Sequence, residues 1–349
     1  MQQVQPVIAG QPGSEAANSQ LSPSNSAPAI IFEHVTKRFP GSTLAAVDDV
    51  SLEVESGTLV VLFGPSGCGK TTLMKTVNRL HEHDSGRILV EGREARSFKV
   101  TDLRRRIGYV IQSTGLFPHM TVAKNIATVP EMLGWDKERV DKRIDDLLDL
   151  IGLPPQEYRE RYPAQLSGGQ QQRVGLARAM AADPSIMLMD EPFAAIDNIT
   201  RRRLQDELLS IQSKVRKTIL FVTHDVEEAI RLADKIVVMR QGKVVQYDTP
   251  LHILTRPADG FVTDLMGAED VLRRLSLLSV ESVMLPPPAQ PMSGVGTAPT
   301  LNPTDSLRDA LNDLLSSDSP VLMVEDAGGH VIGTLDLNAI KRATHGEDM

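Results

Sequence analysis

The 349-residue sequence contains a single cysteine, Cys68, and few aromatic residues, which make up 4% of the chain. One cysteine excludes an intrachain disulfide, and a chain without disulfides is typical of a reducing, cytoplasmic compartment. The scarcity of aromatic side chains disfavours a surface on which nucleic-acid bases stack. The formal net charge of −8 also disfavours a protein that coats nucleic acid, because such proteins are usually basic.

Long apolar stretches are also missing. No run approaches the roughly 18 consecutive apolar residues that indicate a membrane-spanning helix. The first 36 residues contain no lysine, no arginine and no long apolar core, so they do not read as a secretory signal. Residues 1–28 are rich in Gln, Ser, Pro, Ala and Asn without apolar periodicity, which predicts a disordered tail.

The clearest motif is a glycine-rich loop between an apolar run at 59–63 and an amphipathic run that follows. It fits the phosphate-binding pattern G-x-x-x-x-G-K-[ST] and consists of Gly64, Pro65, Ser66, Gly67, Cys68, Gly69, Lys70, Thr71 and Thr72. Glycines let backbone N–H groups curl around an anion, and the next helix adds its positive end. Lys70 would reach the β- and γ-phosphates of a nucleotide, and Thr71 would offer its hydroxyl to Mg²⁺. The alternative is a glycine-rich turn without a ligand, which the flanking strand and helix disfavour.

An acidic pair follows a short apolar run at 185–189. Asp190 at the end of this predicted strand suits a Mg²⁺ ion held through water. Glu191 can orient or deprotonate an attacking water molecule. An Asp-Glu pair alone could equally be a solvated turn, so this assignment depends on the phosphate loop nearby.

Strands and helices alternate over about residues 29–268, with polar residues at the strand ends. This predicts an α/β sheet whose site lies at the carboxyl ends of its strands. The expected strands lie at 30–35, 50–54, 59–63, 87–90, 107–111, 185–189, 218–223, 236–239 and 243–246, and the clearest helix at 136–152. Residues 269–303 read as a helix and a proline-rich linker. A compact unit at 304–345, with a start as early as 279, would hold helix 304–316, strands 321–325 and 330–335, and helix 336–343.

A second anion site is predicted downstream of the phosphate loop. After Leu166, the residues Ser167, Gly168, Gly169 and Gln170 open another helix. One ATP molecule has one γ-phosphate, so two such sites in one chain need an explanation. A dimer in which each chain completes the nucleotide site of the other would use both.

Together with Gln112 and His224, these motifs resemble the nucleotide-binding subunit of ATP-binding-cassette (ABC) transporters over about residues 30–265. The resemblance implies a P-loop NTPase fold with a RecA-like core, an antiparallel β subdomain and an α-helical subdomain. It also implies ATP and Mg²⁺ as cofactors, with Thr71, Gln112 and Asp190 around the metal.

The resemblance implies roles for single residues as well. Phe39 would stack on adenine, and Gln112 would link Mg²⁺ and the attacking water to the transmembrane partner. Glu191 would be the general base, and His224 would contact the γ-phosphate. Residues 167–170 would bind the γ-phosphate in trans, with Asp197 at the dimer seam.

Each role has a plainer alternative. Phe39 could be loop or core packing, Gln112 a surface glutamine, and His224 a core or helix-cap histidine. The run 201–203, three arginines, could suggest nucleic acid, although a solvated helix face is the simpler interpretation.

The chain carries one cassette and no long insertion between Lys70 and Ser167, which implies a separate importer ATPase. It would form a homodimer on the cytoplasmic face of the inner membrane, docked on two permease subunits through residues 113–122. An extracytoplasmic solute-binding protein would act with it indirectly, and nucleic acid would not be a partner. The amino-acid sequences of 113–122 and 193–201 look most like those of ATPases from importers of glycine betaine, choline or carnitine, although Ala194 and Asn198 depart from the usual pattern.

Three other functions stay open at this point. They are an importer ATPase for another small polar solute such as an amino acid, an export ATPase, and a non-transport ATPase acting on nucleic acid or ribosomes.

Residues 280–343 resemble one CBS (cystathionine-β-synthase-type) motif, on the strings 304–307 and 324–326 with Gly328, Ile332 and Gly333. Osmoprotectant ATPases often carry two such motifs in tandem, so a lone motif would need a partner from the other protomer. It could be a sensor of ionic strength, a nucleotide site, or a structural appendage.

Overall fold

The computed structural model describes residues 27–112, 115–194, 196–287, 299–317 and 319–345. The tail expected at 1–28 lies almost wholly outside these ranges, as does the middle of the expected linker. Within the described ranges, no helix is both long and apolar enough to cross a bilayer.

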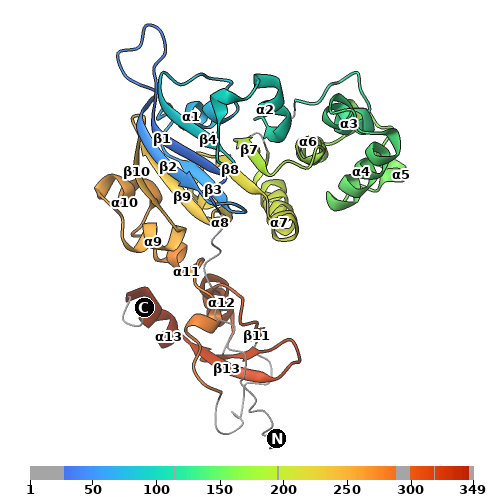
Figure 1. Cartoon of the computed structure of the whole chain (residues 1–349). Helices are drawn as coiled ribbons and strands as arrows, with labels where there is room; N and C mark the ends of the chain where they lie inside the picture. Colours follow the sequence, from blue (N-terminus) through green and yellow to red (C-terminus); the bar gives the residue numbers. More distant parts are fainter. Residues whose placement is uncertain (1–26, 113–114, 195, 288–298, 318, 346–349) are drawn as a thin grey trace, which may run out of the picture.

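A six-stranded sheet lies at the centre of the larger part of the chain (Figure 1). Its order is β10-β9-β3-β8-β7-β6, and all pairs are parallel except β9 with β10. The strands are β3 (Leu59–Phe63), β6 (Ile107–Val110), β7 (Ile186–Asp190), β8 (Thr218–Val222), β9 (Lys235–Arg240) and β10 (Lys243–Asp248). Strands β3, β7 and β8 are buried at every residue, as expected for parallel strands covered on both faces.

A four-stranded antiparallel sheet packs beside it, in the order β2-β1-β4-β5. Its strands are β1 (Ile30–Lys37), β2 (Val47–Val54), β4 (Ser85–Val90) and β5 (Arg93–Glu94), followed by η1 (Ala95–Ser97) and α2 (Val100–Arg106). Helix α1 (Lys70–Val77) packs between the two sheets, because Leu73 and Met74 share one apolar cluster with Phe32 of β1 and Leu62 of β3.

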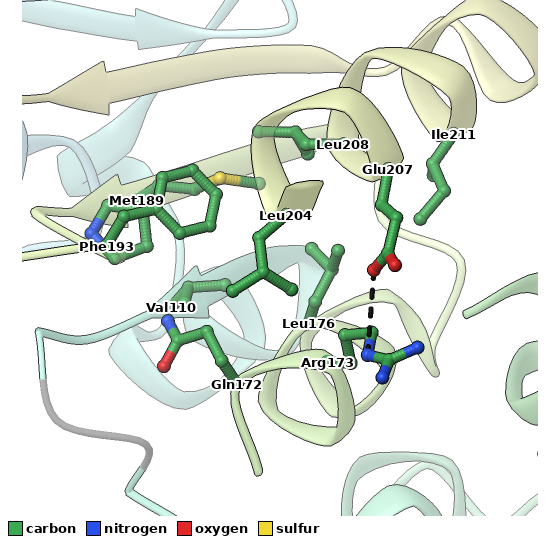
Figure 2. Close-up of a pocket in the computed structure, with 11 residues that line it drawn as sticks. Val110, Gln172, Arg173, Leu176, Met189, Phe193, Leu204, Glu207, Leu208 and Ile211 are labelled. Carbon is green, nitrogen blue, oxygen red and sulfur yellow. Dashed lines mark ion pairs between the residues drawn. The ribbon is translucent and has the colours of Figure 1, made fainter. Parts of the chain in front are cut away.

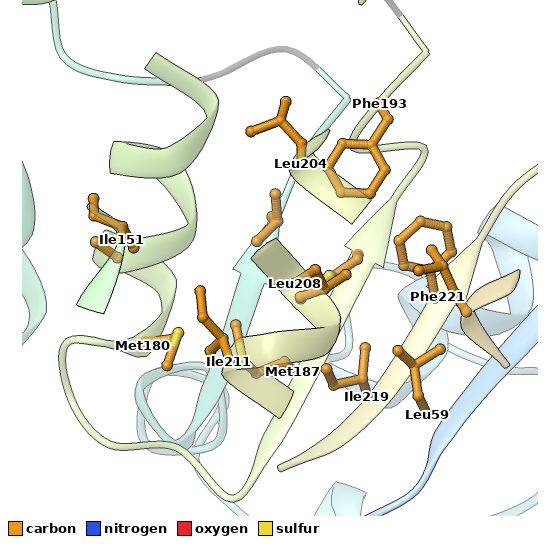
Figure 3. Packing of buried hydrophobic residues seen from close by; sticks show 14 of the residues in the cluster. Leu59, Ile151, Met180, Met187, Phe193, Leu204, Leu208, Ile211, Ile219 and Phe221 are labelled. Carbon is orange, nitrogen blue, oxygen red and sulfur yellow. The ribbon is translucent and has the colours of Figure 1, made fainter. Parts of the chain in front are cut away.

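The other face of the six-stranded sheet is covered by helices (Figure 3). The sheet has one apolar cluster on each face, and successive residues of β3 point to opposite faces. Val60 and Leu62 belong to the cluster that contains α1, whereas Leu59 and Val61 belong to the cluster under the helices of the other face. Figure 3 shows Leu204, Leu208 and Ile211 of one helix directed toward the strands. The helices on this side are α6 (Gly168–Met180), α7 (Asn198–Val215), α8 (Val226–Leu232), α9 (Pro250–Thr255) and α10 (Gly260–Met266).

A helical region projects from one side of the sheet, and α6 lies between this region and the sheet (Figure 1). The region contains α3 (Val122–Met132), α4 (Lys137–Leu150), α5 (Pro155–Tyr158) and η2 (Pro163–Gln165). The expected helix at 136–152 is α4. Asp136 caps it by accepting from the N–H of Arg139, and Val140, Ile144 and Leu147 are buried. The α/β fold predicted from the sequence is thus confirmed.

The C-terminal unit is an α+β arrangement with its own apolar cluster. It holds η3 (Val280–Ser282), β11 (Thr300–Leu301), α12 (Leu307–Ser316), β12 (Val321–Glu325), β13 (Val331–Asp336) and α13 (Leu337–His345), and α11 (Val271–Leu275) leads into it. Strand β12 pairs parallel with β11 and antiparallel with β13. Helix α12 begins at Leu307 rather than at the predicted residue 304, because Ser306 is its N-cap. Leu275 of α11 is part of the apolar cluster of the C-terminal unit.

Candidate active site

The glycine-rich loop connects the end of β3 to α1, and its backbone excludes side chains at two positions. A Cβ added to Gly64, at φ 150°, would lie 2.4 Å from the carbonyl oxygen of Met239. A Cβ on Gly69, at φ 110°, would lie 2.1 Å from the carbonyl oxygen of Ala46. The two glycines therefore fix a tight loop that other residues could not form.

The loop presents positive charge at the start of α1. Lys70 is buried, and its Nζ donates to the carbonyl oxygens of Gly64 (2.7 Å) and Pro65 (3.0 Å). The N-cap of α1 is Gly69, and no side chain caps the helix. Uncapped N–H groups beside a lysine are suited to an anion such as a nucleotide phosphate. Burial raises the pKa of the Cys68 thiol, which fits a small packing residue rather than a reactive one.

Asp190 meets this loop from the end of β7. Thr71 Oγ1 donates to Asp190 Oδ1 at 2.8 Å, and only 9% of Asp190 is exposed. Hydroxyl and carboxylate oxygens are the donors that Mg²⁺ prefers, so the pair fits this metal. Among the described residues no group of three or more His, Cys, Asp and Glu side chains could hold a metal by itself. Phosphate oxygens and water would have to complete the coordination.

Glu191 lies one residue further along, in a backbone conformation that is unusual for glutamate, with φ 45°. Its N–H donates to the carbonyl oxygen of Val222 at the end of β8. Its Oε2 is 3.1 Å from His224 Nδ1 and accepts a long contact of 3.5 Å from Gln112 Nε2. Gln112, Glu191 and His224 thus converge from the ends of β6, β7 and β8.

Phe39 lies apart from this convergence. Its ring meets the ring of His81 edge-on at 5.3 Å between centroids, and Lys37 Nζ lies 5.6 Å from its centroid. Because 38% of Phe39 is exposed, the ring remains accessible to a ligand.

The string 167–170 forms the start of α6 as a capping box. Ser167 Oγ accepts from the N–H of Gln170 at 3.3 Å, and Gln170 Oε1 accepts from the N–H of Ser167 at 2.9 Å. A Cβ added to Gly168 would meet no atom of the described residues within 4 Å, whereas one on Gly169 would lie 3.1 Å from Thr200 Cγ2. Helices α1 and α6 cover opposite faces of the six-stranded sheet, so one chain does not join its two anion sites.

Asp197 is the N-cap of α7 and accepts from the N–H of Thr200 at 3.0 Å. This backbone hydrogen bond lowers the pKa of the Asp197 carboxyl. Thr200 is also the residue that faces Gly169, so the first turns of α6 and α7 lie together. Asp197 and the 167–170 string thereby share one edge of the molecule.

Behind these turns, α6 and α7 enclose a cavity of about 20 Å³ (Figure 2). Arg173 Nε and Glu207 Oε2 face each other there at 3.6 Å, and Val110, Leu176 and Leu204 line the apolar side. The buried Nε2 of Gln172 has no hydrogen-bond partner among the described residues. The space suits a single water molecule.

Two residues near Asp190 were not predicted from the sequence. Lys75 Nζ lies 3.2 Å from Asp190 Oδ2, and Tyr109 on β6 lies near the same carboxylate. Burial and Asp190 together raise the pKa of Tyr109. Lys75 could have been found, because it follows Thr71 by four residues and so shares its helix face.

Comparison with known proteins gives the family. Residues 47–194 match the model described as ABC transporter. The chain is 49% identical to the glycine betaine uptake system ATP-binding protein YehX of Escherichia coli, over 88% of this chain and 97% of that protein. It is 42% identical to the osmoprotectant import ATP-binding protein OsmV of Salmonella typhimurium, over 90% and 81% of the two chains.

A third relative is the carnitine transport ATP-binding protein OpuCA of Listeria monocytogenes, with 43% identity over 88% of this chain and 75% of that protein. Among solved structures, a dimeric ATP-binding cassette in a post-hydrolysis state bound to ADP and Pi aligns with a TM-score of 0.56 and 29% identity. The alignment covers 63% of this chain and 98% of that one. The chain therefore belongs to the ABC transporter family, as an ATP-binding subunit that couples ATP hydrolysis to transport.

Proposed function

We propose that this chain hydrolyses ATP for an importer of a compatible solute such as glycine betaine, choline, carnitine or proline betaine. The observation that carries the ATPase site is the convergence of Gln112, Glu191 and His224 beside the Thr71–Asp190 pair. The solute class is supported by the relatives, since the printed names of YehX, OsmV and OpuCA all refer to osmoprotectants or related quaternary amines.

The geometry suggests how the residues divide the work. The loop N–H groups and Lys70 would bind the β- and γ-phosphates, and Thr71 with Asp190 would hold Mg²⁺, with Gln112 beside them. Bound Mg²⁺ would neutralise charge on the phosphates. Glu191 would accept a proton from the attacking water, a step that contributes roughly 10²- to 10⁴-fold in rate. His224 holds the Glu191 carboxylate, and its 57% exposed side chain can also face the γ-phosphate.

A second copy of the chain would complete each nucleotide site. Ser167, Gly168, Gly169 and Gln170 would face the partner's γ-phosphate, with Asp197 at the seam. The open space at Gly168 supports this role, since no described residue of the chain requires a glycine there. The related cassette that binds ADP and Pi is itself described as a dimer.

Two permease subunits would dock on the segment 113–122, of which residues 113 and 114 lie outside the described residues. A groove of about 300 Å³ adjoins it, lined among others by Arg104, Phe117 and Arg178. Arg178 Nη1 donates to the carbonyl oxygen of Gly115 at 2.6 Å, and its guanidinium lies 5.7 Å from the Phe117 ring centroid. Basic and aromatic walls suit a permease helix with acidic and apolar residues.

In this arrangement the ATPase lies on the cytoplasmic face of the inner membrane, held there by the permease. The extracytoplasmic solute-binding protein would act on it only through the permease. The C-terminal unit would serve as a single CBS-like motif that pairs with its copy in the second protomer, as a regulatory sensor or as a dimer contact.

Uptake measurements test the proposal. The chain is expressed with its permease and binding protein, and labelled glycine betaine, choline, carnitine and proline are supplied separately. We expect ATP-dependent uptake of at least one quaternary amine. Uptake of an amino acid alone would favour the other importer class. ATP hydrolysis that responds to nucleic acid, with no uptake, would refute a transport role.

A further inference from the structure

The carboxylate of Asp190 is already paired with a cation in this structure. Its Oδ1 accepts from Thr71 Oγ1 at 2.8 Å, while its Oδ2 lies 3.2 Å from the ammonium of Lys75. Tyr109 of β6 lies close enough for Asp190 to raise the pKa of its hydroxyl, after the larger effect of burial. Two side chains of α1 therefore contact a carboxylate of a residue that is 9% exposed.

Helix α1 gives this arrangement its geometry. Thr71 and Lys75 are four residues apart, so both face β7. The helix cannot turn away, because Leu73 and Met74 on its other sides are fully buried between the sheets. The side chain of Lys75 is 27% exposed, so its ammonium can move toward solvent while the helix stays in place.

Other basic side chains lie in the same region as Lys75. His81 lies close enough for Lys75 and Lys37 to lower the pKa of its imidazole, after the larger effect of burial. Among the described residues, Asp190 is the carboxylate with which Lys75 forms an ion pair.

We propose that Lys75 is an internal counter-ion of Asp190, which holds the carboxylate before Mg²⁺ arrives and gives way when Mg²⁺ and nucleotide bind together. The inference rests on the proposed function, in which Asp190 helps to hold Mg²⁺. With Lys75 in place the pair has no net charge, so free Mg²⁺ is attracted weakly. The phosphates of a nucleotide supply the additional negative charge, and metal binding then depends on the nucleotide.

The test is a Mg²⁺ titration of ATP binding by the purified full-length chain, followed with a fluorescent ATP analogue. At a separation of about 6 Å, charges of +1 and +2 in water repel enough to change binding by up to about tenfold. We therefore expect Lys75→Met to lower the Mg²⁺ concentration at half-saturation by about three- to tenfold. Lys75→Arg keeps the charge and should stay within about twofold of the wild type.

Thermal unfolding gives a second readout that does not depend on turnover. In EDTA, Lys75→Met should melt below the wild type, because it leaves Asp190 without a counter-ion. Millimolar Mg²⁺ without nucleotide should raise its melting temperature but leave the wild type unchanged. Lys142→Met is the matched control: Lys142 pairs with Asp146 at 3.8 Å on an exposed helix face, and its loss should change neither measurement.

The outcomes separate the two proposals. A Mg²⁺ midpoint for Lys75→Met that equals or exceeds the wild-type value overturns the counter-ion role. If Lys75→Met does not fold, Lys75→Gln is measured in its place, with the same expectation. If the wild type itself binds ATP without any dependence on Mg²⁺, the proposed site fails, and the counter-ion role fails with it.

Discussion

Replacing Gly168 with alanine separates the effect of this glycine on the stability of its own chain from its proposed role at the nucleotide site of a partner chain. Gly168 is the exposed first residue of α6, and an added Cβ would meet no atom of the described part of the chain within 4 Å. Its φ lies outside the left-handed region, so alanine fits the backbone. Alanine restricts the unfolded chain more than glycine does, which should stabilise the protein by about 0.5–1 kcal/mol. For a chain of this size the melting temperature should rise by about 1–3 °C.

The same methyl group should abolish function if the glycine faces the partner's nucleotide. We expect Gly168→Ala to lose at least about tenfold in ATP turnover while its melting temperature rises. Gly260→Ala is the matched control, because Gly260, like Gly168, is the exposed first residue of a helix with a side-chain cap, here Asp259. A Cβ added to Gly260 would likewise meet no described atom within 4 Å. It should show a similar gain in stability and full turnover. Full turnover in both variants would refute the role of Gly168 in trans.

Two buried titratable side chains give further predictions, both measured by urea denaturation across pH. His83 is 2% exposed, neither ring nitrogen has a hydrogen-bond partner among the described residues, and burial lowers its pKa from 6.5. Its neutral form is favoured in the folded state, so the wild type should lose stability as pH falls below about 6.5, and His83→Leu should lose less. Glu228 is 5% exposed, and burial raises its pKa from 4.5 while Gln205 Nε2 donates to it at 3.0 Å. The wild type should lose stability as pH rises above about 4.5. Glu228→Gln keeps the Gln205 contact, and its stability should depend less on pH. For either residue, a variant whose stability changes with pH in parallel with the wild type would contradict the prediction.

The strands that carry the site could be predicted because their signals are local. The apolar runs at 59–63 and 218–222 are short, continuous and bounded by polar site residues, which is typical of buried parallel strands. Strand β12 of the C-terminal unit also matches its predicted range of 321–325, and it is buried at Leu322 and Val324. Helix α4 was equally clear, since its buried residues recur at helical spacing.

Other elements depend on contacts that no local pattern reveals. Helix α3 contains Pro130, a residue that usually ends helices, and its burial against α6 outweighs that preference. The two-residue strand β11 exists only because Thr300 and Leu301 pair with β12, more than 20 positions along the chain. The resemblance to ABC transporters implied that residues 112, 191 and 224 belong to one site, but it did not imply the contact of Phe39 with His81.

The most direct test of the account is the ATP turnover of Glu191→Gln, measured together with the oligomeric state in ATP and Mg²⁺. Glutamine keeps the shape of the side chain that contacts Gln112 and His224 but cannot accept a proton from water. We expect a loss of turnover of at least about 100-fold, with ATP retained in a stable dimer. Near-normal hydrolysis by this variant would contradict the assignment of Glu191 as the general base.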